Sequence, residues 1–180
     1  MLKKTRFIIG IILFSTFTST LMAYSGGSGT EISPYQIDNL SDLQYLSTHS
    51  GDWDKYFIQT SNIDASATTT WNSGTGFSPI GNLYTFFTGD YDGNGKVISN
   101  LYINRSENRQ GLFGNIDEAN IINLGLTNAN ITGALYSGAL VGKAHDCTIS
   151  NCYASANVTG TDYVGGLVGN GSSFSTFSNC

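Results

Sequence analysis

Hydrophobic and polar positions follow one recurring pattern over residues 111–180. The phrase GLFG returns as GALVG and again as GGLVG, and each copy is followed by short apolar stretches separated by Gly, Asn, Ser and Asp. Leu112, Leu140 and Leu167 hold equivalent places in the three copies, at nearly equal intervals. A period in the range of about 20–50 residues is typical of solenoids, propellers and repeat arrays. The pattern divides this region into repeats at about 111–137, 138–164 and a truncated 165–180.

Each repeat contains three short strand-like pieces and no long stretch with helical periodicity. Without a crossover helix, such a unit buries its apolar residues by coiling and stacking its strands in parallel on those of its neighbours. A propeller blade usually needs about 40 residues or more, and no leucine-rich framework recurs. The sequence therefore predicts an all-β fold, a right-handed parallel β-helix (β-solenoid). We expect about four coils rising ~4.8 Å each, the first of them at Phe77–Ile103.

Three asparagines recur with the same period. Asn123, Asn151 and Asn179 are equally spaced, and each has apolar neighbours at an odd spacing, which strict alternation cannot place on one face. Asparagine tolerates the left-handed conformation, so a bend there would turn both neighbours inward. We predict that these side chains form a structural amide ladder rather than a ligand site. The pattern also predicts two internal stacks: Leu112, Leu140 and Leu167 in one, and Leu124, Cys152 and Cys180 in the other.

The phrases GLFG, ALVG and GGLVG, with SNCYASANVTG after the second, resemble the GLUG repeat. This repeat occurs in large secreted and surface-attached bacterial proteins, including adhesin-like proteins and some immunoglobulin A-specific metallopeptidases. Residues 77–101 are similar to the segment that commonly leads into such repeats, so the resemblance extends upstream of the repeats themselves. It implies a repeat architecture on an exported protein, and it carries no catalytic residue over to this chain.

Residues 1–23 read as a signal peptide. Three basic residues precede the apolar stretch FIIGIILF, and a small residue, Ala23, stands before a Ser/Gly-rich tract. We expect cleavage after Ala23 and a secreted or cell-surface location, with no membrane span in the mature chain. An uncleaved anchor is the alternative, although the stretch is shorter than the ~20 apolar residues that a span needs.

Residues 24–76 are expected to form a flexible lead, at 24–30, and a small α/β N-terminal cap. The best helix of the chain begins here, with Ser41 as the predicted N-cap and Leu43 and Leu46 on its apolar face. A cap would cover the unpaired strand edge at the start of a β-helix, which otherwise invites aggregation. Trp71, on a polar excursion, is expected to pack back onto this cap.

The mature chain is acidic. Removing the three basic residues of the predicted signal leaves five basic residues (8 − 3) against 13 acidic ones, a net charge near −8. Such a chain is not expected to bind nucleic acid. No sequence feature calls for a cofactor, and Cys152 and Cys180, with parallel side chains one coil apart, are expected as buried small hydrophobes rather than a disulfide.

One segment has the beginning of a calcium loop. Asp90, Asp92 and Asn94, followed by Gly95, supply oxygen ligands at alternate positions. The twelfth position is Leu101 instead of the bidentate glutamate, so the signal is weak and turn formation explains the glycines. The two histidines are far apart in sequence, and no Cys/His pair has a zinc spacing. We therefore expect no metal site, with this loop as the one weak candidate.

Nothing in the sequence marks a catalytic centre. HExxH is absent, and the one carboxylate group worth considering is Asp90, Asp92 and Asp117, which could meet on one wall of a polysaccharide-active β-helix. The leading interpretation is an exported surface or adhesin-like protein that is structural or binds a host or environmental surface, through a glycan or a protein. A non-catalytic repeat region of a secreted peptidase and a polysaccharide-active enzyme are the alternatives. The last repeat phrase is incomplete, which suggests a fragment of a longer reading frame.

Overall fold

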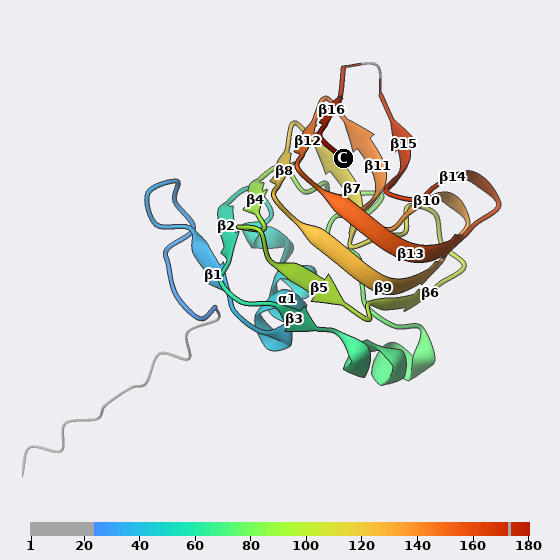
Figure 1. The fold of residues 1–180 in the computed structure, drawn as a ribbon, viewed down its shortest axis with the longest axis horizontal. Coiled ribbons are helices and arrows are strands. Elements are labelled where there is room, and N and C mark those ends of the chain that lie inside the picture. The colour runs from blue at the N-terminus through green and yellow to red at the C-terminus, as the bar shows by residue number, and fades with distance from the viewer. Residues whose placement is uncertain (1–23, 173) are drawn as a thin grey trace, which may run out of the picture.

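The chain winds into a parallel β-helix. The computed structural model describes residues 24–172 and 174–180, so the predicted signal peptide lies outside the described residues. Strands from successive repeats lie side by side (Figure 1), and every pairing between two named strands is parallel. Strands of neighbouring repeats are thus related by the sequence period, and the predicted fold class is confirmed.

The strands form four parallel sheets along the helix axis. The first sheet contains, in order, β1 (Tyr35–Ile37), β2 (Tyr56–Gln59), β4 (Asp90–Asp92), β8 (Asn120–Ile122), β12 (Thr148–Ser150) and β16 (Thr176–Ser178). The second contains β13 (Tyr153–Thr159), β9 (Gly125–Thr132), β5 (Val97–Ser99) and β3 (Ile63–Asp64), and β6 (Tyr102–Asn104) also pairs with β9. The third contains β15 (Val168–Gly171), β11 (Val141–His145) and β7 (Phe113–Asp117). The fourth pairs β10 (Leu135–Gly138) with β14 (Asp162–Gly165).

Register follows the repeat. Val141 pairs with Phe113 on one side and Val168 on the other, so equivalent positions of three repeats lie in line. Chain order then gives three coils, β4–β6, β7–β10 and β11–β14, followed by the first strands of a fourth, β15 and β16. From residue 77 onward this matches the expected count, but β2 and β3, which pair with β4 and β5, add strands of an earlier turn that was not expected.

The two predicted stacks lie at equivalent positions, but their last members are less buried than expected. Leu112, Leu140 and Leu124 are fully buried and Cys152 nearly so, while Leu167 is half-buried against the core. Cys180, in contrast, is exposed, so its prediction as a buried hydrophobe is wrong. Among the described residues, the coil that contains Cys180 has a neighbouring coil on one side only. All three cysteines are free thiols.

The asparagines bend the chain at the end of the first-sheet strands. Asn123, Asn151 and Asn179 have φ values of 56°, 53° and 53°, which lie in the left-handed region. Their side chains form a ladder, in which Asn151 Nδ2 donates to Asn123 Oδ1 at 3.0 Å and Asn179 Nδ2 donates to Asn151 Oδ1 at 3.2 Å. The backbone bend and the amide ladder therefore occur at the same residue in each coil.

A second ladder, which the sequence reading did not identify, lies at another corner. Asn100 and Asn128 are also left-handed, with φ values of 60° and 52°, and Asn128 Nδ2 donates to Asn100 Oδ1 at 2.6 Å. Each ladder starts on an aspartate: Asn123 donates to Asp92 at 3.0 Å and Asn100 donates to Asp64 at 2.8 Å. Because an ionised carboxylate can only accept, it fixes the direction of every amide that follows.

The N-terminal segment is part of the same β-helix. β1 and β2 pair in parallel with each other, and β2 pairs with β4, so the first sheet continues across the boundary drawn at residue 77. Helix α1 (Leu40–Thr48) begins earlier than expected, because Asn39 rather than Ser41 is its N-cap. The Asn39 side chain accepts from the backbone N–H groups of Ser41 and Asp42. Leu43 and Leu46 are buried as predicted.

Residues 24–30 are held in place, so the expectation of a flexible lead is wrong. Tyr24 is buried, and its hydroxyl donates to Asp52 at 3.0 Å. The backbone of this segment exchanges hydrogen bonds with Gln36, which lies on β1. Burial of one aromatic ring and pairing with β1 outweigh the Ser/Gly-rich composition.

Two 3₁₀ helices complete the N-terminal region. They are η1 (Ser50–Asp52) and η2 (Ser66–Gly74), and the second, which is interrupted by non-helical backbone at residues 71–73, carries the polar excursion. Trp71 is partly buried, but its ring stacks at 6.4 Å from that of Phe77, at the start of the predicted first coil rather than in the cap. Among the described residues, no helix is long and apolar enough to cross a membrane.

Replacing Asn151 separates the two roles of the bend. We expect Asn151→Ala to lose about 1–2 kcal/mol for the left-handed backbone and about 0.5–1.5 kcal/mol for each ladder bond. Asn151→Gly keeps the conformation and should lose the bonds alone. Urea unfolding of both variants, with the exposed Thr161→Ala as control, measures the difference. Equal stability of all three would contradict the ladder.

The ladders also set an acid limit to stability. Hydrogen bonds from Asn100 and then from Ser66 lower the pKa of the Asp64 carboxyl, and bonds from Ser61 and Thr60 lower the pKa of Asp38. A carboxyl whose pKa is lower in the folded state than in the unfolded state stabilises the fold at pH values above its unfolded pKa, which is near 3.8 for aspartate. This stabilisation is lost as the pH falls through the folded-state pKa. Asp64→Asn keeps an acceptor that does not titrate.

We therefore expect the urea midpoint of Asp64→Asn to fall less steeply below about pH 4 than that of the parent chain. Glu31→Gln, which changes an exposed carboxylate, should follow the parent profile. Parallel profiles for Asp64→Asn and the parent would show that the Asp64 bond does not contribute.

Candidate binding face

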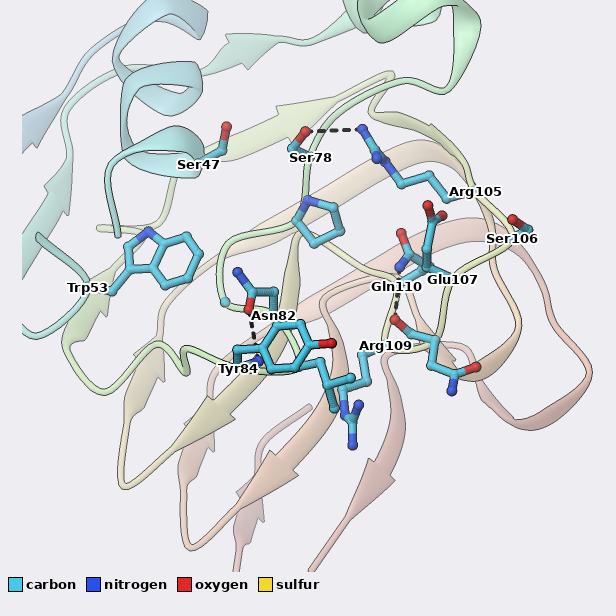
Figure 2. A pocket seen from close by; sticks show the side chains of 14 residues that line it. Ser47, Trp53, Ser78, Asn82, Tyr84, Arg105, Ser106, Glu107, Arg109 and Gln110 are labelled. Atoms are coloured by element: carbon cyan, nitrogen blue, oxygen red, sulfur yellow. Dashed lines mark hydrogen bonds between the residues drawn. The ribbon is translucent and has the colours of Figure 1, made fainter. Parts of the chain in front are cut away.

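A pocket of about 720 Å³ opens on one side of the β-helix. Helix α1 and Trp53 form one wall, residues 78–84 form the second, and residues 105–110 form the third (Figure 2). A smaller pocket of about 250 Å³ lies beyond Leu83 and is lined in part by β7 and β11. Leu83 and Arg109 line both pockets, so the two form one surface, which we call the binding face.

A tight turn presents apolar side chains at the centre of this face. Asn82 holds the turn, since its side-chain oxygen accepts from the backbone N–H groups of Tyr84 and Thr85 at 2.9 and 3.1 Å. Leu83, Tyr84 and Phe86 are exposed by 52%, 89% and 40%. A turn that fixes its own backbone can hold an exposed aromatic ring without packing it into the core.

Basic side chains concentrate on the same face. Five basic residues fall within 24–180, and three of them, Arg105, Arg109 and Lys143, line its two pockets. None of the three makes a salt bridge within the described residues. Arg105 is instead held by the backbone oxygens of Phe77 and Gly76 and by the Ser78 hydroxyl.

Arg109 and Lys143 share one aromatic neighbour. The Arg109 guanidinium carbon lies 5.8 Å from the centre of the Tyr136 ring, and Lys143 Nζ lies 5.4 Å from it. The Tyr163 ring, one repeat later, lies 5.1 Å from that of Tyr136. Cations over an aromatic face are attracted by its negative potential. The Tyr136 ring thus lies near two like charges, and Asp117, the carboxylate that lines the smaller pocket with them, pairs with His145 instead.

Two adjoining residues of this face are unsatisfied. Arg109 Nε and Gln110 Oε1 are buried and have no hydrogen-bond partner within the described residues. Gln110 is 4% exposed, and its Nε2 donates to the Asn108 backbone oxygen at 3.0 Å, which leaves its oxygen as the orphan. Arg109 also has a left-handed backbone with φ 64°. Backbone strain and unpaired buried polar atoms cluster at functional sites in proteins.

The candidate calcium loop is engaged by its own neighbours. Asp90 and Asp92 lie on β4, where Asp90 accepts from Asn120 and Asp92 accepts from the Asn94 backbone N–H at 2.7 Å and from Asn123. Asn94 donates to the Gln59 backbone oxygen. Within residues 24–172 and 174–180, no group of three His, Cys, Asp or Glu side chains is placed to hold a metal ion.

The structure does not bring the three predicted carboxylates to one wall. Asp90 and Asp92 belong to the first sheet, while Asp117 ends β7 in the third sheet. There, Asp117 pairs with His145 Nδ1 at 2.8 Å. Each of these acids has its own polar partner, and no shared site for a glycosidic oxygen is formed by them.

Sequence reasoning missed the binding face, although one signal was available. Tyr136 and Tyr163 both stand just before a repeat glycine, at the same position of their repeats, so the repeat itself places their rings in register. Arg105, Arg109 and Lys143 carry no local motif. Their meeting depends on how adjacent coils stack, which spacing alone does not show.

The chain is similar to a known repeat family and to two larger proteins. Residues 133–159 match the family model described as the GLUG motif. The chain is 45% identical over 140 residues to Halomucin of Haloquadratum walsbyi, covering 75% of this chain and 2% of that protein. It is 36% identical over 141 residues to a candidate Gly-rich membrane protein of Evansella cellulosilytica, covering 76% of this chain and 16% of that one. The chain thus spans a small part of the curated relatives that it matches.

A solved structure shares the fold. The crystal structure of a candidate immunoglobulin A1 protease from Bacteroides ovatus superposes with a TM-score of 0.52 at 17% identity, over 86% of this chain and 67% of that one. At this identity the likeness concerns the fold alone. The GLUG repeat and the β-helix both agree with the sequence-based identification.

Calcium should not stabilise this chain. Asp92 already accepts two hydrogen bonds, so binding the ion would break one end of the asparagine ladder. We expect the same melting temperature in chelator and in millimolar calcium, and a local effect only from Asp90→Asn. A rise of many degrees on adding calcium, abolished by Asp90→Asn, would instead establish the Asp90–Asn94 loop as a calcium site.

Proposed function

We propose that this GLUG-repeat chain is a surface-associated binding protein in which the β-helix is a stiff scaffold and the binding face makes the contact. The observation that carries the proposal is the segregation of side chains. Asparagine, glycine and aliphatic residues occupy the repeated positions, while the exposed Leu83, Tyr84 and Phe86 and three of five basic residues lie on one face. Such a patch marks an interaction surface more often than a random distribution of the same residues.

The surface location has two supports. Residues 1–23 read as a signal peptide for export. The relatives that share three quarters of the chain are named Halomucin and a candidate Gly-rich membrane protein, names that belong to surface or membrane-associated proteins. An adhesin-like role in contact with a host or environmental surface follows from combining export with the binding face.

A binding role without catalysis fits the geometry of the acids. An enzyme needs polar groups that converge on a reacting atom with pKa values suited to proton transfer. Here Asp90 and Asp92 accept hydrogen bonds from ladder amides, and Asp117 accepts from His145. The pairing leaves each acid occupied by a structural partner, which favours support of the coils over chemistry.

Two measurements test this proposal. Protease added to intact cells that express the gene should degrade the chain without lysing the cells, which places it at the surface. The purified chain should show no turnover of casein, immunoglobulin A or a panel of polysaccharides. Retention of the chain inside protease-treated cells would contradict the location. Turnover that is abolished in Asp90→Asn, Asp92→Asn or Asp117→Asn would contradict the non-catalytic role.

A further inference from the structure

We propose that the binding face recognises an acidic carbohydrate, one whose sugar rings carry carboxylate or sulfate groups. In this arrangement Arg109 and Lys143 hold the acid group, and Tyr84 packs against a sugar ring. The inference rests on the proposed function, because it names the ligand class of the same face.

The charge distribution points to an anion. The mature chain carries five basic and 13 acidic residues, so acidic side chains outnumber the basic side chains that could pair with them. Lys55 pairs with Asp54 at 3.0 Å. The other four basic residues make no salt bridge within the described residues, and two of them, Arg109 and Lys143, lie near one ring. These two cations repel one another, and the Asp117 carboxylate that lines the smaller pocket with them is paired with His145, so an external anion would reduce that repulsion.

The side-chain chemistry of Arg109 and Lys143 suits a planar carboxylate or a tetrahedral sulfate group. A guanidinium presents a rigid fork of donors that matches two oxygens of a carboxylate or sulfate, while an ammonium acts as a flexible point charge beside it. Arg109 is half-buried and its backbone is held by a hydrogen bond from its N–H to the Leu135 oxygen at 2.8 Å. The backbone of Arg109 is therefore fixed, its guanidinium lies over the Tyr136 ring, and Arg109 Nε lacks an acceptor within the described residues.

The rest of the pocket suits a sugar. Its volume of about 720 Å³ lies in the range of small-molecule sites. Tyr84 offers an aromatic face that is 89% exposed, and such a face packs on the apolar side of a sugar ring. Gln110 contributes a buried amide oxygen with no partner among the described residues, an acceptor for a hydroxyl group. Asn82 and Asn108 line the same pocket with further amide groups.

Two carboxylates lie on the binding face: Glu107 lines the larger pocket, and Asp117, which pairs with His145, lines the smaller one. Figure 2 shows Glu107 at the Arg105 end and Arg109 at the opposite end, with Tyr84 beside the latter. An acid group is repelled by Glu107 and attracted by Arg109, so it belongs at the Arg109 end. Hydroxyl groups of the next ring can donate to Glu107. A long polyanion such as nucleic acid is disfavoured, because the mature chain as a whole is strongly acidic.

Calorimetric titration of the full chain tests the inference with defined probes. The acidic probes are a galacturonate hexamer and a chondroitin sulfate hexamer, and the neutral probe is a galactan hexamer of matched length. We expect binding of one or both acidic probes, at least about tenfold tighter than the neutral one, and weaker binding at higher salt. The difference between the two acidic probes identifies carboxylate or sulfate as the recognised group.

Matched variants locate the site. Lys143→Gln and Arg109→Gln should each weaken binding of the acidic probe about tenfold, the loss expected of a hydrogen bond to a charged group. Lys96→Gln, which removes the same charge outside both pockets, should leave it unchanged. Tyr84→Ala removes an exposed ring without disturbing the core and should weaken binding as well. Circular dichroism of each variant checks that the fold is kept.

Several outcomes would overturn the inference. They are equal binding of the acidic and neutral hexamers, an equal loss in Lys96→Gln and Lys143→Gln, and binding of a glutamate hexapeptide as tight as that of the acidic sugars. Absence of binding by every acidic probe would also overturn it. The surface location measured on intact cells does not depend on that result. A chain that is not at the surface would instead remove the proposed function on which the inference rests.

Discussion

The left-handed asparagine at the corner of each coil is the constraint on which the rest of the structure depends. At Asn123 and Asn151 the chain turns between two inward-facing apolar residues, which an extended strand cannot accommodate. Asparagine adopts this conformation at lower cost than other residues with a side chain, and its amide also bonds the coil on either side. Glycine would permit the same bend without the amide ladder, so the choice of asparagine couples the path of one coil to that of the next.

Other bends of the coils carry left-handed residues that are not asparagine. Arg109, Tyr136 and Tyr163 have φ values of 64°, 65° and 51°, so they occupy left-handed corners too, although none is asparagine or glycine. Such residues cost about 1–2 kcal/mol each in this conformation. Parallel pairing of β10 with β14 holds the two tyrosines in this conformation, and the result is a cation and two aromatic rings close to one another. Structural and binding corners thus use the same backbone geometry with different side chains.

The sequence predicted those features that recur with the repeat period. The parallel strands, the ladder at Asn123 and Asn151 and the stacked leucines all repeat, so a single chain contains several copies of each signal. The N-cap at Asn39 and the burial of Tyr24 occur once, and Tyr24 also depends on a contact with the distant Asp52. Composition indicated flexibility for residues 24–30, but one buried ring and pairing with β1 decide their structure.

The binding face was beyond prediction for a related reason. Arg109 and Lys143 are far apart in sequence and meet only because two coils bring both of them to the Tyr136 ring. Spacing in the repeat predicts which positions stack, but it does not show which corner faces outward or where neighbouring loops leave a pocket. That information comes from the turn at Asn82 and the position of α1, neither of which repeats.

Nuclear magnetic resonance of the labelled chain measures the central claim directly. Three-bond couplings and one-bond Cα–Hα couplings give the backbone φ of Asn100, Asn123, Asn128 and Asn151, and nuclear Overhauser contacts between side-chain amide protons report the ladders. The left-handed ladder requires positive φ at all four residues and amide contacts between Asn123 and Asn151, one coil apart. Negative φ at these positions, or side-chain amides that contact solvent only, would contradict it.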